Sequence, residues 1–244
     1  MNKNENIIWN ELFNKKKFKY TIESEKINKI TSYKLARIIY PELTKKKFSK
    51  IIFFLKKNLK IKKNKKLLDF GSGNGAFLMN FQKKVKSVYS MEISKPLINF
   101  QKEKFKNIKY YLTNPYNIKF YKKINHNEID LTICNSSFQY FYSNFYCELI
   151  LKEMIRTTKE TIFIYDIKDK SKKKEYLINL RKRQKMSKLQ FLEKYKSTPL
   201  RFYNKKFFVK FMKKNYPKLN FKFLKLPKEA TDSKFGYCFK INKI

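Results

Sequence analysis

A cluster of glycines that follows a short apolar run is the feature that most constrains the fold. The chain has 4 glycines in 244 residues, and three of them, Gly71, Gly73 and Gly75, are separated by single residues. Glycine permits positive φ and has no Cβ, so it suits a tight turn to which a ligand approaches closely. The apolar run is 67–70, and an amphipathic run at 77–85 follows the cluster. The segment predicts a buried strand, a glycine turn and a helix.

Strands and helices alternate along the middle of the chain. Apolar runs predict four more strands, at 87–92, 108–112, 129–134 and 161–165, and helical patterns separate some of them, at 96–105 and 145–157. Such alternation favours a mostly parallel sheet that binds ligands at the carboxyl ends of its strands. Alternating runs at 221–226 and 236–241 predict a closing antiparallel pair. We therefore expect an α/β three-layer sandwich around a seven-stranded sheet.

Helical segments flank and interrupt this core. Residues 1–60 have helical periodicity that Pro41 breaks, and we expect them to form an extension packed on the core, with Trp9 as an anchor. Residues 61–244 are expected to form the ligand-binding domain. Within it, 168–204 is a basic helical insertion, the expected substrate region.

The formal net charge of +40 raises the question of nucleic-acid binding. Arginine, the better residue for bidentate phosphate recognition, occurs only five times, and the lysines are spread along the whole chain. Abundant lysine, asparagine and isoleucine are typical of drift in an AT-rich genome. A solvated basic surface is therefore favoured over a dedicated nucleic-acid face, and anionic partners over cationic ones.

The cysteines and the apolar segments indicate a cytoplasmic location. The three cysteines, Cys134, Cys147 and Cys238, are too few and too scattered for a disulfide framework or a zinc site, so we expect no metal. No secretory signal is visible near Met1, and the apolar cluster 51–55 is too short to span a membrane. The oligomeric state stays open.

Glu92 follows the glycine turn at an informative distance. It ends the predicted strand 87–92, about 20 residues past Gly71, where a nucleotide-binding βαβ unit places a carboxylate for ribose hydroxyls. Each charge-assisted hydrogen bond of this kind contributes roughly 1.5–3 kcal/mol. An acid at a strand end can also be merely solvated, but its combination with the glycine turn favours the ribose role.

These residues together resemble the class I, Rossmann-like S-adenosylmethionine-dependent methyltransferases. The segment 69–75 fits the acidic D/E-x-G-x-G-x-G motif of that family at every position, and 130–140 is similar to its fourth-strand motif. A dinucleotide dehydrogenase would instead need glycine where this chain has Ala76. The resemblance implies S-adenosylmethionine as the cofactor.

The resemblance also implies which residues hold the cofactor. The glycine turn would lie under its methionine and ribose parts, with Asp69 at the methionine amino group. Asn114 stands where the family often has an acid that contacts adenine, and its amide carbonyl can accept the same hydrogen bond. The full implied set is Asp69, Gly71, Ser72, Gly73, Gly75, Glu92, Ile93, Asn114, Pro115, Asn135 and Ser136.

Methyl transfer from a sulfonium is an in-line displacement, so alignment of the reactants supplies most of what an enzyme must provide. No catalytic dyad is required. An alcohol acceptor would benefit from a base, for which Asp166 and Tyr140 are candidates, whereas Gln139 is better suited to orient the acceptor. His126, the one histidine, lies in a polar loop and is expected to be solvated.

Three of the five arginines, Arg181, Arg183 and Arg201, lie in the basic insertion. Their position suggests an anionic group on the acceptor. A methyltransferase acting on a small, anionic O- or N-acceptor is thus our leading hypothesis. An RNA or protein methyltransferase, supported by charge alone, and a noncatalytic cofactor-binding or scaffold protein stay open.

Overall fold

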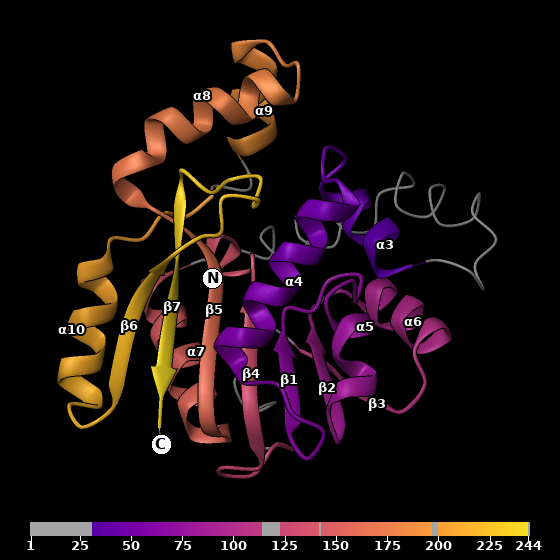
Figure 1. Cartoon of the computed structure of the whole chain (residues 1–244). Coiled ribbons are helices and arrows are strands. Elements are labelled where there is room, and N and C mark those ends of the chain that lie inside the picture. The colour runs from indigo at the N-terminus through magenta and orange to yellow at the C-terminus, as the bar shows by residue number, and fades with distance from the viewer. Residues whose placement is uncertain (1–30, 114–122, 142, 197–199, 244) are drawn as a thin grey trace.

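A single mixed sheet forms the centre of the computed structural model, which describes residues 31–113, 123–141, 143–196 and 200–243. Its strand order is β3-β2-β1-β4-β5-β7-β6 (Figure 1). All neighbours are parallel except β7, which runs antiparallel to β5 and β6. The strands are β1 (Lys66–Phe70), β2 (Ser87–Glu92), β3 (Ile108–Leu112), β4 (Ile129–Asn135), β5 (Thr158–Lys168), β6 (Asn220–Lys225) and β7 (Gly236–Asn242). The predicted α/β fold with its closing antiparallel pair is confirmed.

Helices cover both faces of the sheet. They are α3 (Ser32–Ile39), α4 (Lys45–Leu59), α5 (Leu78–Phe81), α6 (Lys95–Lys104), α7 (Asn144–Thr157), α8 (Lys173–Arg183), α9 (Lys188–Lys196) and α10 (Lys205–Asn215). Short 3-10 turns are η2 (Gln82–Lys84), η4 (Phe138–Tyr140) and η5 (Lys170–Lys172). The helix after the glycine turn is shorter than the pattern at 77–85 suggests, because its last turn tightens into η2.

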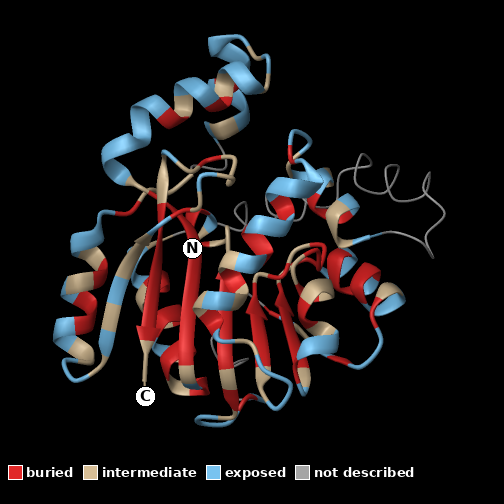
Figure 2. Cartoon of the chain, in the orientation of Figure 1, coloured by how far each residue is buried: buried red, intermediate tan, exposed pale blue. Residues whose placement is uncertain are grey.

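The alternation of side chains along each strand builds two cores. Leu67 and Phe163 point into a core shared with α3, α4, α5 and α6, whereas their neighbours Leu68 and Ile164 point into a core shared with α7 and α10. This is the period of two expected for strands buried on both faces. Figure 2 shows the central strands as buried, whereas the edge strands β3 and β6 are partly exposed.

The helices α3 and α4 pack on the first of these cores. Thr31 and Thr44 cap them, each accepting a hydrogen bond from a backbone N–H three residues later. The interruption that Pro41 predicts is present between the two helices. Trp9, our expected anchor, lies outside the described residues.

The basic insertion forms α8 and α9, which stand beyond the end of the sheet, clear of the two helical layers (Figure 1). Their own small core contains the buried side chains of Tyr176, Leu180 and Phe191. Within the described ranges, no helix is both long and apolar enough to cross a membrane.

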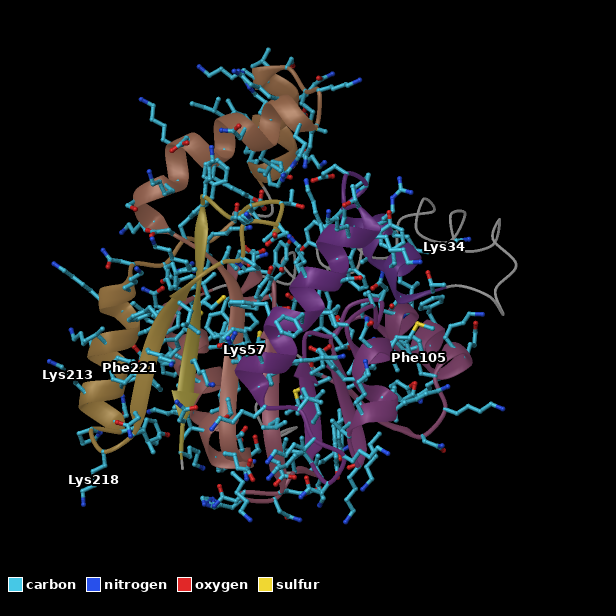
Figure 3. The ribbon with its side chains drawn as sticks, in the orientation of Figure 1. Lys34, Lys57, Phe105, Lys213, Lys218 and Phe221 are labelled. Atoms are coloured by element: carbon cyan, nitrogen blue, oxygen red, sulfur yellow. The ribbon has the colours of Figure 1, made fainter. Side chains whose placement is uncertain are left out.

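Lysines occur on several separate elements of the described structure. The lysines labelled in Figure 3, Lys34, Lys57, Lys213 and Lys218, belong to α3, α4, α10 and the turn after α10. This dispersion agrees with a solvated basic surface and gives no single basic stripe among these residues.

A substitution at Phe208 tests the packing of the second core, the one shared with α7 and α10. Its ring is fully buried and lies 4.7 Å from the ring centroid of Phe239, among several other aromatic rings. We expect Phe208→Ala to lower the free energy of unfolding by about 3–5 kcal/mol, because a large cavity replaces the ring. Urea denaturation measures this. The control is Phe145→Ala, on a side chain that is 69% exposed, which should change stability by less than about 0.5 kcal/mol. Equal losses of stability in Phe208→Ala and Phe145→Ala would contradict the placement of Phe208 in the second core.

Candidate functional site

A cavity of about 150 Å³ lies at the carboxyl ends of β1, β2 and β4. It is lined by seven of the predicted cofactor residues, Gly71, Ser72, Gly73, Glu92, Ile93, Asn135 and Ser136. Asp69 and Gly75 are not part of its wall, and Asn114 and Pro115 lie outside the described residues. The structure thus brings together residues from three strand ends, as a parallel sheet predicts.

The need for glycine has a different physical reason at each of the three clustered positions. All adopt positive φ, between +57° and +76°. A Cβ on Gly71 would lie 2.3 Å from Ser137 Oγ, and one on Gly75 would lie 2.3 Å from the Phe105 ring, so these two glycines make room for protein atoms. A Cβ on Gly73 would meet nothing within 4 Å. Close approach of a ligand therefore explains Gly73 alone.

Glu92 holds the glycine turn with its carboxylate. Oε2 accepts a hydrogen bond from Gly73 N at 2.8 Å, and Oε1 accepts from Ile93 N at 2.8 Å and Ser94 N at 3.1 Å. A carboxylate has about four lone-pair sites, so one on Oε2 is left for a ligand hydroxyl. Burial raises the pKa of Glu92, and the three N–H donors oppose that shift.

Asp69 is buried without the partner that its charge requires. Its side chain is 1% exposed, and Oδ1 has no hydrogen-bond partner in the described part of the chain. Burial, aided by the nearby charge of Glu92, raises its pKa to about 8. A buried carboxylate is stable in its charged form only when paired, so a cationic group close to Asp69 would stabilise that form.

A buried polar network that the sequence analysis missed holds the glycine turn in place. Gln101 Nε2 donates to Ser72 Oγ at 2.9 Å and to Gly73 O at 2.6 Å, and Ser90 Oγ donates to Gln101 Oε1 at 2.7 Å. All three side chains are buried. They come from α6, the turn and β2, so no local pattern marks them.

The helix α3 forms one wall of the cavity through Ala36, Ile39 and Tyr40. It is fastened to the glycine turn because Asn74 Nδ2 donates to Leu35 O at 2.7 Å. At its end, Tyr40 Oη donates to Ser136 Oγ at 3.0 Å. These contacts hold α3 against the glycine turn and the end of β4.

Ser136 connects this cavity to a second, smaller one of about 30 Å³. Ser136 Oγ donates to Asp166 Oδ2 at 2.9 Å, and both residues have positive φ, +51° and +62°. Such φ values are uncommon outside glycine and gather at functional sites. Tyr165 also lines this cavity, and its buried hydroxyl has no hydrogen-bond partner among the described residues.

Behind Asp166 lies a buried ion cluster. Lys168 Nζ donates to Asp166 Oδ1 at 2.8 Å and to Asp232 Oδ2 at 2.7 Å, and Arg183 donates to Asp232 Oδ1 at 2.9 Å. Burial raises the pKa of Asp166 while Lys168 opposes the shift. Burial would lower the pKa of Lys168, but the two carboxylates outweigh it and raise that pKa. The cluster joins β5 to α8 and to the loop before β7.

The catalytic candidates lie near this cluster in different settings. Tyr140 lines the first cavity and Asp166 the second. Gln139 is buried and donates through Nε2 to Ser136 O at 2.7 Å, so it braces the strand end and does not line either cavity. Asp166 and Gln139 both bond to Ser136, which lines both cavities together with Tyr40, Phe77 and Asn135.

The three arginines have separate surroundings. Arg183 is bound by Asp232, and Arg201 donates to Asn144 Oδ1 at 2.9 Å. Arg181 is half-buried on α8. They do not form one shared hydrogen-bonded group in the contacts that the structure gives.

The histidine and the three cysteines have different surroundings. His126 is exposed, and Cys134, Cys147 and Cys238 are buried and free of disulfides. Over the described ranges, no group of three or more potential metal ligands is present.

Comparison with known proteins identifies a family. A profile described as a methyltransferase domain matches residues 61–225. No curated protein matches the sequence significantly.

Solved structures give the same fold. A methyltransferase from Clostridium acetobutylicum that depends on S-adenosylmethionine is 13% identical, with coverage of 93% of this chain and 97% of that chain and a TM-score of 0.60. Magnesium protoporphyrin IX methyltransferase from Synechocystis, with bound S-adenosylhomocysteine, is 11% identical over 98% and 100%, with a TM-score of 0.59. Geranyl diphosphate C-methyltransferase from Streptomyces coelicolor is 13% identical over 80% and 78%, with a TM-score of 0.54.

The unpaired Asp69 predicts a pH dependence of stability. Its pKa in the folded protein, about 8, exceeds the ordinary value of 3.8, so the folded state keeps a proton that the unfolded state releases. Stability is then lost as pH rises from about 4 to 8. Asp69→Asn should remove this loss and be more stable than the unsubstituted protein at pH 8, by on the order of 5 kcal/mol, with a smaller difference at pH 5.

Urea denaturation without added ligand, at both pH values, measures the effect. The control is Glu103→Gln, which alters an exposed carboxylate and should leave the pH dependence unchanged. Parallel pH profiles for Asp69→Asn and the unsubstituted protein would show that Asp69 has an ordinary pKa.

Proposed function

Because the chain belongs to the class I S-adenosylmethionine-dependent methyltransferases, we propose that it transfers a methyl group from this cofactor to a small acceptor. The observation that carries the proposal is the unpartnered Oδ1 of buried Asp69, close to a glycine turn whose Gly73 faces open space. A cofactor with a cationic amine and ribose hydroxyls complements these groups. The cavity residues therefore fit the cofactor of the family.

Each part of the cofactor has a proposed set of contacts. Asp69 would hold the methionine amine and Glu92 Oε2 a ribose hydroxyl. Ile93 and Thr113 line the same cavity and lead toward Asn114, the proposed adenine contact. When bound, S-adenosylmethionine supplies an activated methyl group on a positively charged sulfur.

The protein's contribution is alignment and exclusion of water. Phe70, Phe77 and Phe141 give the cavity an apolar wall, and α3 covers it through Ile39. Holding the reacting atoms in line can supply several kcal/mol, of order 7–11 in ideal cases. A strong general base is therefore useful but not essential.

For a hydroxyl or amine acceptor, we propose that its proton leaves through Tyr40 and Ser136 to Asp166. The hydrogen bonds already run in this direction, from Tyr40 to Ser136 and from Ser136 to Asp166. As the acceptor oxygen or nitrogen gains the methyl group, its proton passes to Tyr40 Oη, the tyrosine proton passes to Ser136, and the serine proton passes to Asp166. Burial raises the pKa of Tyr40, so it transmits a proton without remaining a phenolate.

The acceptor is proposed to be a small, anionic molecule. Arg181 and Arg201 on the insertion support this, whereas Arg183 already has the carboxylate of Asp232 as its partner. One similarly folded protein has geranyl diphosphate, a small anion, in its complex. The three buried, reduced cysteines support a cytoplasmic location.

Measurement of cofactor binding tests the proposal that this chain uses S-adenosylmethionine. Isothermal calorimetry should detect binding of S-adenosylmethionine and S-adenosylhomocysteine, and Glu92→Ala and Gly73→Val should each weaken it by about tenfold or more. The first change removes an acceptor of roughly 1.5–3 kcal/mol and the second places a branched side chain at positive φ in the open cradle.

The control for these changes is Glu103→Ala on the exposed face of α6, which should keep the affinity of the unsubstituted protein. Thermal melting checks that each variant is folded. Unchanged affinity in folded Glu92→Ala and Gly73→Val proteins would reject the proposed pocket.

The proton route is tested by turnover. With an acceptor found by screening hydroxyl and amine compounds for release of S-adenosylhomocysteine, Tyr40→Phe and Ser136→Ala should lower kcat by about a hundredfold, with a smaller effect on KM. Asp166→Asn should also abolish the acidic limb of the pH profile.

Tyr33→Phe is the matched control, since Tyr33 lies on the same helix and its hydroxyl bonds only to the backbone oxygen of Leu43 among the contacts given. It should retain normal kcat. A Ser136→Ala enzyme with normal kcat and an unshifted pH profile would rule out the route.

A further inference from the structure

A large apolar groove lies on the helical insertion, apart from the cofactor cavity. It has a volume of about 630 Å³, against about 150 Å³ for the cofactor cavity. Its walls come from α8, α9 and the segment 200–202. Because the sheet core is complete without these helices, the groove requires an explanation of its own.

The groove is lined mainly by apolar side chains, and two of them stay open to solvent. Leu189 is 79% exposed and Leu192 is 56% exposed, although both lie on its wall. The other apolar lining residues pack against or belong to the small core of the insertion: Leu177, Phe191, Tyr195, Leu200 and Phe202. Burial of such side chains contributes about 1.5–3 kcal/mol each, so an apolar occupant would be stabilised here.

The charges at the groove are predominantly positive. Lys173 and Lys196 line it, with Glu193 as the one acidic residue in its wall. Lys173 Nζ lies 5.8 Å from the Phe202 ring, and no ion pair to Lys173 occurs among the described residues. A lysine above an apolar wall recognises a negative charge attached to an apolar body.

The segment that carries Leu200 and Phe202 of the groove is attached to the wall of the cofactor cavity. Arg201 N, between these two groove residues, donates to Gln139 O at 2.9 Å, and Tyr203 Oη donates to Phe138 O at 3.0 Å. The segment is therefore fastened to η4, whose Tyr140 lines the cofactor cavity.

We propose that this groove binds the apolar body of an amphiphilic anion, a molecule with a hydrocarbon chain or ring system and a carboxylate or phosphate group. Resting on the proposed function, this molecule is the methyl acceptor, with its reactive end toward Tyr140. The apolar wall holds the body and Lys173 holds the anionic group. The class of substrate is thereby narrowed from a small anion to an amphiphile.

A dissolved amphiphile explains the groove better than a membrane surface does. The apolar side chains line a concave volume, and a single hydrocarbon chain can enter it. A membrane-binding helix instead presents its apolar side chains on a convex face. Binding to vesicles is therefore a separate outcome of the experiment.

The experiment titrates the full-length protein with a fluorescent dansyl-labelled undecanoic acid and then competes with unlabelled ligands. We expect saturable binding of one probe per chain. Dodecanoate should displace the probe more effectively than dodecyltrimethylammonium, which has the same chain length and the opposite charge.

Two substitutions separate the apolar and the charged contributions. Leu192→Ser, at an exposed position where folding should be unaffected, should weaken probe binding by about tenfold. Lys173→Glu should lower the affinity for dodecanoate by about fivefold and should leave the affinity for dodecyltrimethylammonium unchanged or increase it. The control is Lys182→Glu, an exposed α8 residue outside the groove, which should change neither.

The outcomes distinguish this inference from the proposed function. Absence of saturable probe binding, equal binding by Leu192→Ser, or binding of the protein to phosphatidylglycerol vesicles without binding of the monomeric probe would each overturn the amphiphile site. Calorimetry with S-adenosylmethionine on the same preparations reports the cofactor pocket independently. Probe binding without cofactor binding would reject the proposed function and leave the groove as a ligand site.

Discussion

The three hydrogen bonds accepted by the Glu92 carboxylate are the constraint on which the cofactor side of this molecule depends. One joins β2 to the glycine turn after β1, and two close the turn that begins α6. They act together with the backbone bonds from Gly71 N and Ser72 N to Met91 O, which also hold the glycine turn at the end of β2. A single buried acid thus sets both the backbone that faces the ligand and the acceptor atom that remains for it.

The acceptor side depends on a different kind of constraint, the buried pairing of Lys168 with Asp166 and Asp232. Burying one of these charges alone would cost several kcal/mol, so their positions are strongly coupled. Through Arg183 the same cluster extends to α8. The insertion is consequently attached to Asp166, the proposed proton acceptor, by charge as well as by packing.

The two halves of the site differ in how far the sequence predicts them. The glycine cluster and Glu92 are local signals, because strand, turn and acid follow one another within a short stretch, and the structure confirms the fold that they imply. The second cluster has no local signal. Asp166 and Asp232 are far apart along the chain, and Lys168 is one lysine in a chain where lysine is abundant. The cluster matters because its charged side chains are buried, and burial cannot be read from amino-acid composition.

The arginines show the same limitation in another form. Their position in a basic insertion predicts an anionic ligand near α8 and the segment after α9, but the side chain of Arg183 binds an internal carboxylate. Counting charged residues along a chain cannot separate a cation that faces a ligand from one that faces a buried acid. To make that distinction one must know which side chain the cation contacts. For Arg183 this is Asp232, which lies far along the chain in the loop before β7.

The proposed cofactor site and the proposed acceptor site lie on separable parts of the chain. The cofactor cavity is formed by strand ends and by α3, whose contacts to the glycine turn are internal to the sandwich. The groove belongs to α8 and α9, which have their own small core. Under the proposed function, substitutions in α9 alter which acceptor binds without disturbing Glu92. The groove segment is linked to the wall of the cofactor cavity by the hydrogen bond from Arg201 N to Gln139 O, next to Tyr140 in η4.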